Sequence, residues 1–412
     1  MEELKVINSK SETKSLITGS ETVEILNLGI HGYADSFFLP NEIEKASQGL
    51  PLICRLDLET GLVQTQTVTD PIERYSGVDY SYTSSNSATA RHHWNDFAND
   101  LRKRRLIEGS KILEIGSNDG FLLSQFLGEA SQLVGVDASP YMVSLANSNG
   151  VKTFQGVFGE SDILNQELTE DAKEFDIIIA NNVLNHSNNP VNFLKNIKNL
   201  LSPKGDFVFE VPYWLETIKS LHFDQIYHEH VTYLTAHSVE RLLEMAELFI
   251  NQIEIVDYHG GSLRVIACRK KPSEPAAGLL KLKEAERLEE LSNPLRYVKY
   301  FNDIMEHKEN FLQKLNRFKI KKGEAIFGIG AAAKANTLLT FYGLDNTQID
   351  FILDASEFKQ GKITPITKIP IYPDSHLAAQ KGGIGITLAW NIGESIKKKL
   401  YTINKNIEVI GI

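Results

Sequence analysis

The stretch Lys111–Gly120 reads KILEIGSNDG, an apolar run that passes into a loop with two glycines. Three more apolar runs follow along the chain, LVGVD at Leu133–Asp137, FDIIIAN at Phe175–Asn181 and DFVFEVP at Asp206–Pro212. Strands separated by about ten or more helical residues are typical of a parallel, doubly wound sheet. The sequence therefore predicts an α/β domain of this kind, and we expect LRVIACR at Leu263–Arg269 to be its final strand.

The loop after the first of these strands has the features of a cofactor site. A glycine directly after a parallel strand lets the backbone approach a ligand that a Cβ atom would exclude, and an acid at the end of the second strand can bind both hydroxyls of a ribose. The spacing G-x-x-x-G differs from the G-x-G-x-x-G that makes room for a dinucleotide pyrophosphate. The pattern favours S-adenosylmethionine over NAD, and the alternative is an ordinary tight turn with an N-capping Asp. The expected cofactor-binding residues are Glu114, Gly116, Asn118, Asp119, Gly120, Asp137 and Asn181.

The parts of the chain on either side of this sheet have different sequence patterns. Residues 1–75 contain short strand-like runs separated by turn residues, which predicts a small β-rich module. The sheet itself occupies the range 76–270. Residues 271–412 begin with a polar helical region, Leu279–Lys322, and continue in a second α/β pattern. We therefore expect three domains with these boundaries.

A second glycine loop lies in the last of these domains. Gly328–Ala333 reads GIGAAA and fits G-x-G-x-x-A, and IDFILD ends in Asp354, about where a ribose-binding acid would lie. Taken alone, this pattern could indicate an NAD domain, or a doubly wound domain that packs its helix closely through small residues. Lys334 adds a cation in the first turn of the helix, which suits a phosphate.

A segment rich in titratable side chains, FDQIYHEH, spans Phe223–His230 and follows the strand that ends at Pro212. This is the C-terminal edge of the sheet, where open α/β proteins bind ligands. Tyr227, Glu229 and His230 could supply a hydrogen-bond donor, an orienting carboxylate and a base. The alternatives are a solvated polar turn or a metal site, although H-E-H lacks a third nearby ligand at helical spacing.

Two further runs of polar residues lie near the ends of expected strands. The run NNVLNH extends the strand Phe175–Asn181 from Asn181 to His186, toward the expected cofactor edge. The run HGGSLR places two glycines between His259 and Arg264. The arginine could bind a phosphate or a keto oxygen, and a β-hairpin with a surface arginine is the alternative.

Composition limits the class of protein. Of 412 residues, 42% are hydrophobic and 23% charged, which matches soluble globular averages. The net charge of −10 disfavours general nucleic-acid binding. Two cysteines, Cys54 and Cys268, cannot build a disulfide framework or a Cys-rich zinc site. No segment reaches the ~20 apolar residues of a membrane helix, and no signal peptide is recognisable. We expect a cytoplasmic enzyme without nucleic-acid or membrane partners.

Together the motifs resemble those of the sugar C-methyltransferases, S-adenosylmethionine-dependent enzymes that act on C3 of nucleotide-linked 4-keto-6-deoxy sugars. The resemblance extends over almost the whole chain and is carried by LEIGSNDG (Leu113–Gly120), QIYHEH (Gln225–His230), HGGSLR (His259–Arg264) and GAAAKANTLL (Gly330–Leu339). It implies an N-terminal zinc-binding module, a central class I methyltransferase domain and a C-terminal Rossmann-like domain. In this family the last domain helps to hold the nucleotide sugar rather than NAD.

The chain departs from the family in its N-terminal module. The family carries C-x-x-C pairs before the equivalents of ILNLG and GLVQ. Here the first region, Ile7–Ser20, contains no cysteine, and in the second region Cys54 stands alone and out of step. A structural zinc site needs about four N or S ligands. We expect the module to be held by its own packing, with no metal site.

The resemblance also implies a mechanism. A ketone at C4 acidifies the C3 hydrogen, so a modest base can form an enolate that attacks the sulfonium methyl group. His230 is the implied base, with an imidazole near its unperturbed pKa of ~6.5 and with Glu229 orienting it. The remaining catalytic candidates are Tyr227, His186, Tyr82 and Tyr80, and the substrate-binding candidates are His259, Arg264, Lys334 and Asn336.

Other functions stay open at this point. A small-molecule O- or N-methyltransferase would need the cofactor loop but no base beside a ketone. A non-catalytic binding scaffold and an NAD enzyme are further alternatives. The sequence does not decide between dTDP and GDP as the nucleotide, between inversion and retention at C3, or between a monomer and a dimer.

Overall fold

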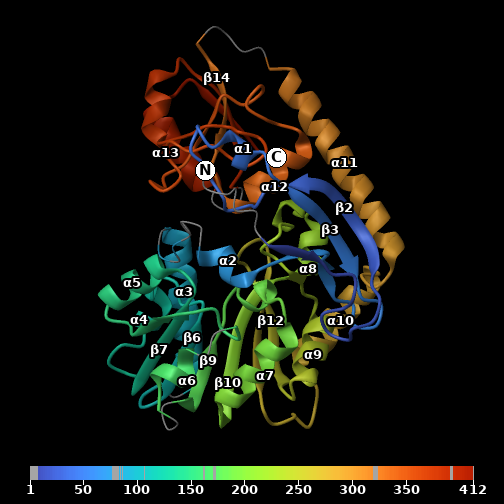
Figure 1. Cartoon of the computed structure of the whole chain (residues 1–412), viewed down its shortest axis with the longest axis vertical. Helices are drawn as coiled ribbons and strands as arrows, with labels where there is room; N and C mark the ends of the chain where they lie inside the picture. Colours follow the sequence, from blue (N-terminus) through green and yellow to red (C-terminus); the bar gives the residue numbers. More distant parts are fainter. Residues whose placement is uncertain are drawn as a thin grey trace.

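The computed structural model describes residues 8–76, 83, 85, 87–105, 107–160, 163–169, 173–318, 323–389 and 393–411. They form two lobes, each built around one sheet (Figure 1). The lower lobe contains a seven-stranded sheet and the upper lobe a five-stranded one. The long helix α11 (Pro294–Asn316) and a four-stranded N-terminal sheet lie along one side and join the lobes (Figure 1).

The seven-stranded sheet has the order β8-β7-β6-β9-β10-β13-β12. Its strands are β6 (Lys111–Ile115), β7 (Gln132–Asp137), β8 (Thr153–Gln155), β9 (Phe175–Ile179), β10 (Leu201–Pro212), β12 (Phe249–Val256) and β13 (Ser262–Cys268). Only β13 runs antiparallel to its neighbours within this sheet. A doubly wound sheet with one reversed strand inserted near the edge is the class I methyltransferase arrangement, so the predicted fold class is confirmed.

The expected strand at Leu263–Arg269 belongs to this sheet, but it is not the edge strand. It forms a hairpin with β12, which lies outside it. The central strands are buried on both faces, and the run Ile177–Ile179 is at most 1% exposed. Parallel strands covered on both faces read as continuous apolar runs, which is why the sequence pattern located them.

The helices of this lobe cover both faces of the sheet. Their starts follow local capping rules: α5 begins at Pro140 after the N-cap Ser139, and α7 begins at Pro190 after the N-cap Asn189. The helical elements are α3 (Ala88–Arg104), α4 (Phe121–Ser124), α5 (Pro140–Ser148), α6 (Ile163–Glu167), α7 (Pro190–Leu200), α8 (Trp214–Lys219), α9 (Ala236–Met245) and the short 3-10 turns η2 (Leu184–His186) and η3 (Phe223–Gln225).

The N-terminal sheet is antiparallel and has the order β11-β4-β3-β2. Its outer member β11 comes from the central part of the chain, directly after the histidine-rich segment. The elements of this region are β1 (Ser9–Ser11), β2 (Val23–His31), α1 (Ile43–Ala46), β3 (Leu50–Leu56), β4 (Val63–Thr65), β5 (Thr67–Thr69), α2 (Pro71–Ser76) and β11 (Thr232–Tyr233). The loop after β2 contacts the upper lobe through a bridge between Phe38 and Ile363.

The upper lobe contains a parallel sheet of order β16-β15-β14-β17-β18, a Rossmann-like half with its first strand in the centre. Pro294 is the first residue of α11, and Asn293 caps the helix. The elements are α10 (Ala277–Leu288), α11, β14 (Ala325–Ile329), α12 (Ala333–Tyr342), β15 (Phe351–Leu353), β16 (Ile371–Tyr372), η4 (Asp374–Ala379), β17 (Gly383–Thr387), α13 (Gly393–Ile403) and β18 (Ile407–Gly411).

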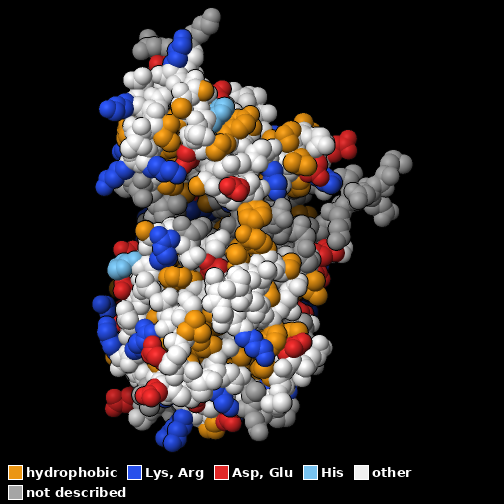
Figure 2. Space-filling view, turned by 90° about the vertical axis from the view of Figure 1, so that its left-hand side faces the viewer, with side chains coloured by type: hydrophobic (Ala, Val, Ile, Leu, Met, Phe, Trp, Pro, Cys, Tyr) orange, Lys and Arg blue, Asp and Glu red, His pale blue; other side chains and the backbone are white. Residues whose placement is uncertain are grey.

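The surface carries mixed charges. On the face shown in Figure 2, basic, acidic and apolar side chains are interspersed over both lobes, without a continuous basic stripe. Among the described residues, no helix is both long and apolar enough to cross a membrane.

Candidate active site

A cavity opens at the C-terminal ends of β6, β7 and β9. The residues that line it include Gly116, Asn118, Asp137, His186 and Tyr75. Gly116 has a φ of 70°, and a Cβ atom there would lie 2.5 Å from Cγ2 of Val183. The glycine is therefore required both by the turn and by the close approach of the neighbouring loop.

Asp137 ends β7 and lies at the wall of the cavity. Its carboxylate accepts hydrogen bonds from the backbone N–H of Asn118 at 2.8 Å and of Ser139 at 2.9 Å. Burial raises the pKa of Asp137 above its usual value, against the effect of these two bonds. A carboxylate has about four acceptor sites, so two remain for ribose hydroxyls.

Several buried polar atoms in the cavity wall have no hydrogen-bond partner among the residues that the structure describes. They are Glu114 Oε2, Ser117 Oγ, Asn181 Nδ2 and Asn182 Oδ1, and all four residues line the cavity. Burial, together with the charges of Asp119 and Asp137, raises the pKa of Glu114 well above its usual value. Buried polar groups are normally paired. A wall of unpaired donors and acceptors therefore fits a polar ligand such as the amino-acid and ribose parts of S-adenosylmethionine.

The loop that follows β6 is held from outside the cavity. The hydroxyl and the backbone N–H of Ser85 both donate to Asp119, and Gly120 has a φ of 75° where α4 begins. Asp119 thus fixes the loop rather than lining the cavity, and Gly120 provides the turn.

A cluster of histidine and tyrosine rings begins in the cavity wall with Tyr75 and His186. Tyr75 Oη lies 2.8 Å from Nδ1 of His186, and the ring of His186 lies 5.0 Å from that of His230, edge to face. Burial lowers the pKa of His186 well below its usual value, and His230 and Arg74 add to the effect. The cluster therefore consists of neutral rings at pH 7.

His230 makes one hydrogen bond through each ring nitrogen. Nδ1 lies 2.8 Å from the carbonyl oxygen of Gln225, and Nε2 lies 2.7 Å from the hydroxyl of Tyr227. Because a carbonyl can only accept, Nδ1 carries the proton and Nε2 is the basic nitrogen. Burial lowers the pKa of His230 to about 4, which replaces the unperturbed value expected from sequence.

Glu229 is not the group that orients His230. Its Oε1 accepts a hydrogen bond from the backbone N–H of Asp35 at 3.1 Å, and the carbonyl of Gln225 fixes the imidazole instead. Burial raises the pKa of Glu229 to about 7. His228, between them, points toward the N-terminal module, where its Nε2 lies 3.2 Å from the carbonyl of Pro51.

A second charged group lies where α12 approaches η3. Burial lowers the pKa of Lys334 to about 8, although the charge of Asp224 acts in the opposite direction. Burial, with the charge of Lys334 as the next cause, lowers the pKa of His259 to about 3 and that of His222 to about 4. The structure thus brings the expected residues Lys334 and His259 near each other.

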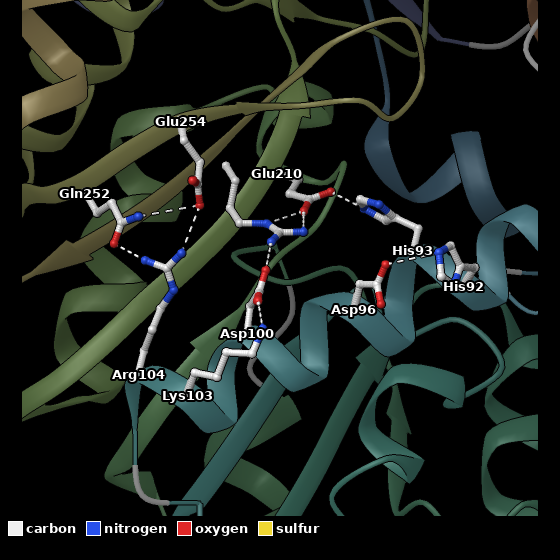
Figure 3. A network of polar contacts seen from close by, with 10 residues as sticks. His92, His93, Asp96, Asp100, Lys103, Arg104, Glu210, Gln252 and Glu254 are labelled. Carbon is white, nitrogen blue, oxygen red and sulfur yellow. Dashed lines mark hydrogen bonds and ion pairs between the residues drawn. The ribbon is translucent and has the colours of Figure 1, made fainter.

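Arg264 is engaged inside the protein. Its Nε donates to Glu210 at 2.6 Å and its Nη1 to Asp100 at 3.0 Å, and Glu210 also pairs with His93 at 2.7 Å (Figure 3). The arginine is 7% exposed and Glu210 is fully buried. A buried carboxylate needs such partners, so the guanidinium neutralises Glu210 in this structure. Its predicted contact with substrate phosphate stays untested.

The remaining candidates are placed as follows. The side-chain amide of Asn336 donates to the carbonyl of Ala34 and ties α12 to the N-terminal module. Tyr80 and Tyr82 lie outside the described residues. Sequence reasoning missed Tyr75, the neighbour of His186, although Tyr75 begins the tyrosine-rich run YSGVDYSY in the sequence. It also missed Arg74, whose Nη1 donates to the carbonyl of His186 at 2.7 Å.

Comparison with known proteins supports this architecture. A family described as "Methyltransferase domain" matches residues 88–252, and one described as "C-methyltransferase C-terminal domain" matches residues 257–409. The C-methyltransferase NovU of Streptomyces niveus is 29% identical over 320 residues, which is 77% of this chain and 75% of that protein.

Other similarities are confined to part of the chain. The ubiquinone biosynthesis O-methyltransferase of Glaesserella parasuis is 33% identical over 101 residues, 24% of this chain and 43% of that protein. The PH0226 protein of Pyrococcus horikoshii has a TM-score of 0.37 and 18% identity, and covers 46% of this chain and 95% of that one. A TM-score this low does not establish a fold. The fold class therefore rests on the strand order of this chain.

Sheet order, cavity and family matches define the chain as an S-adenosylmethionine-dependent methyltransferase. Within that class it is a homologue of the C-methyltransferases, and the resemblance predicted from its motifs is confirmed.

Proposed function

We propose that the protein transfers a methyl group to C3 of a nucleotide-linked 4-keto-6-deoxy sugar through an enolate. The observation that carries the proposal is one cavity whose lining includes Gly116 and Asp137 of the cofactor site as well as Tyr75 and His186. His186 in turn contacts His230. The cofactor loop therefore shares a cavity with His186, and the ring of the proposed base His230 packs against that of His186. This arrangement supports the proposal, because methyl transfer to carbon needs donor and base near one substrate carbon.

The base in this proposal is the pair formed by Tyr227 and His230. The carbonyl of Gln225 holds the proton on Nδ1, so the lone pair of Nε2 faces the Tyr227 hydroxyl at 2.7 Å. Either Nε2 takes the C3 proton directly after the tyrosine moves aside, or the tyrosine oxygen takes it while passing its own proton to Nε2. In both routes the proton ends on His230.

The electrostatics of His230 suit this role. Its pKa of about 4 keeps the imidazole in the basic form throughout the neutral range. A lower pKa also makes the imidazole a weaker base. The enolate forms beside the new imidazolium, and its negative charge stabilises that cation, which offsets the weaker basicity. Tyr227, whose pKa burial raises well above its usual value, stays protonated and can donate to the enolate oxygen.

The cofactor's contribution to this reaction is the methyl group. When bound, S-adenosylmethionine supplies the methyl group on its sulfonium centre. The chain's own part is to hold the ribose at Asp137, to offer the unpaired Glu114, Ser117 and Asn181 to the rest of the cofactor, and to fix the approach of the substrate carbon.

The upper lobe is proposed to hold the nucleotide. Lys334 lies in the first turn of α12, where the helix N-terminus already favours an anion. It lies close enough to His259 to influence the pKa of that residue. The proposed pyrophosphate site is therefore between α12 and the His259 loop, and it also rests on the family resemblance.

Isotope exchange and product analysis test the proposal together. The protein is incubated in deuterated water with dTDP- or GDP-4-keto-6-deoxy sugars, with S-adenosylhomocysteine in place of the methyl donor. We expect C3 deuteration of one nucleotide sugar, and a mass gain of one methyl group when S-adenosylmethionine is supplied. Methylation of a hydroxyl or amine without C3 exchange would instead identify an O- or N-methyltransferase, and neither exchange nor product would indicate a binding scaffold.

A further inference from the structure

Two loops of the N-terminal module have the same pattern in sequence. Residues 15–19 read SLITG and residues 57–61 read DLETG, so Leu, Thr and Gly recur at matching positions. In both loops the glycine has a positive φ, 73° at Gly19 and 67° at Gly61. Each loop therefore ends in a turn of the same hand.

The backbone hydrogen bonds of the two loops also match one for one. The N–H of Ser15 donates to the carbonyl of Ser20 at 2.8 Å, and that of Asp57 donates to Leu62 at 2.8 Å. The glycine N–H of each loop donates at 2.9 Å to the carbonyl of the loop's first residue. The two loops are thus copies of one local structure.

The first side chain of each loop accepts from the backbone within its own turn. Ser15 Oγ accepts from the N–H of Ile17 at 3.1 Å and of Thr18 at 3.2 Å. Asp57 Oδ1 accepts from the N–H of Glu59 at 2.8 Å and of Thr60 at 3.4 Å. The side chains at the first positions consequently point into the turn and toward the other loop.

The two loops meet at the carboxylate of Asp57. Its Oδ2 accepts hydrogen bonds from the hydroxyls of Ser15 at 2.6 Å, Thr60 at 2.7 Å and Thr18 at 3.3 Å. Asp57 and Thr60 are each 1% exposed. Burial acts to raise the pKa of Asp57, but the hydrogen bonds from these hydroxyls and backbone groups outweigh it, and the pKa lies below its usual value.

The four side chains stand at the spacing of a structural zinc site. Ser15 and Thr18 are separated by two residues, as are Asp57 and Thr60, and the pairs precede ILNLG and GLVQ, where the resembled family has C-x-x-C. Three hydroxyls and one carboxylate do not make a zinc site, since such sites use thiolates and imidazoles. Among the described residues, no group of three His, Cys, Asp or Glu could hold a metal.

We infer that the Asp57 carboxylate takes the structural place of the metal. In a zinc site a central cation is held by surrounding anionic ligands. Here a central anion is held by surrounding hydrogen-bond donors, and the same two turns are joined. The inference concerns the N-terminal module and does not depend on the proposed reaction.

Restoring the cysteines tests the inference directly. The variant with Ser15→Cys, Thr18→Cys, Asp57→Cys and Thr60→Cys should retain about one zinc per chain through desalting, and its melting temperature should fall when a chelator is added. The double variant Ser15→Cys, Thr18→Cys is the matched control, because its two thiolates should not retain the metal. A quadruple variant that binds no zinc, or that does not fold with zinc present, would contradict the inference.

The unmodified protein gives the complementary measurement. It should contain no stoichiometric zinc, and a chelator should leave its melting temperature unchanged. Asp57→Asn should lower the melting temperature by several degrees, whereas Glu59→Gln, at an exposed position of the same loop, should not. Stoichiometric zinc in the protein, or an Asp57→Asn variant that melts with the parent, would overturn the assignment.

Discussion

The glycine loops after β6 and β14 are built alike. In each, the acid at the end of the next strand accepts two backbone N–H groups: Asp137 from Asn118 and Ser139 at 2.8 and 2.9 Å, and Asp354 from Ala331 and Ser356 at 2.7 and 2.8 Å. Judged by these bonds alone, both would be nucleotide sites.

The surroundings of the two loops differ. The first faces a cavity with unpaired polar atoms. At the second, the amine of Lys359, 8% exposed, donates to the carbonyl of Ala331 at 2.8 Å, and a Cβ atom on Gly330 would lie 2.7 Å from that of Ala389. The chain's own side chains thus crowd the second loop. A glycine fingerprint specifies a turn, and the neighbouring residues decide whether a ligand can enter.

The largest effect is expected from removing the proposed base, His230, whose ring packs against His186 in the wall of the first loop's cavity. His230→Ala should lose methylation and C3 exchange by ~10²–10⁴-fold, the usual effect of losing a general base. Cofactor affinity, measured by calorimetry, should stay the same because His230 is not among the residues that line the cofactor cavity. A variant that exchanges the C3 proton at the parent rate would move the base to Tyr227 or His186.

His228→Ala is the matched control for that experiment. His228 packs against Tyr33 and lies near the carbonyl of Pro51, away from the cavity. Its loss should affect the rate much less than that of His230. Equal losses of rate would show that the segment acts through its fold and not through one imidazole.

Asp137 and Asp354, the acids that follow the two glycine loops, provide the next test. Asp137→Ala should weaken S-adenosylmethionine binding by ~1.5–3 kcal/mol, the range for hydrogen bonds to a charged group. Asp137→Asn should weaken it less, and Asp354→Asn should leave it unchanged. Calorimetric titration of the three variants checks this, and equal effects of the two asparagine variants would show that the loops do not differ as described.

A smaller effect is expected at Lys334. Lys334→Ala should raise the substrate KM by about tenfold and leave kcat nearly unchanged, because a phosphate contact is made equally in the ground and transition states. With a pKa of about 8, the amine loses its charge as the pH rises through 8, so the parent KM should rise over the same range. Lys334→Arg should move that rise to higher pH, and a pH-independent KM would place the pyrophosphate elsewhere.

The last prediction concerns the stability of the fold at Glu229, not binding or rate. Its pKa is about 7 in the folded protein and near 4.5 when unfolded, because burial penalises the carboxylate. Stability from this group is therefore full below about pH 4.5 and decreases as the pH rises through 7. Glu229→Gln should remove that decrease in denaturant titrations at pH 5 and pH 8. An unchanged pH dependence would assign it to another group.

The fold and the cofactor loop could be predicted because their signals are local. Buried parallel strands give continuous apolar runs. Asp137, at the end of the second strand, follows the glycine loop closely in the sequence. β12 was missed because its run FINQIEIV alternates with polar residues at the sheet edge.

Contacts between distant residues could not be predicted in the same way. The pairing of Arg264 with Glu210 depends on the register of β10 against β13, which no local pattern specifies. The approach of Tyr75 to His186 joins residues 111 positions apart. The pKa of His230 depends on burial by several segments. By contrast, the repeat of SLITG and DLETG is visible in the sequence. That the two loops meet at the Asp57 carboxylate follows only from their hydrogen bonds.

The pairing of β4 with β11 has a consequence for synthesis on the ribosome. β4 is complete at Thr65, but its partner is Thr232–Tyr233. Until the intervening residues have been translated, β4 is the outer strand of the N-terminal sheet and offers an open row of backbone donors and acceptors. This nascent edge can pair with other chains, so the protein is exposed to aggregation until the segment that carries His230 emerges and closes it.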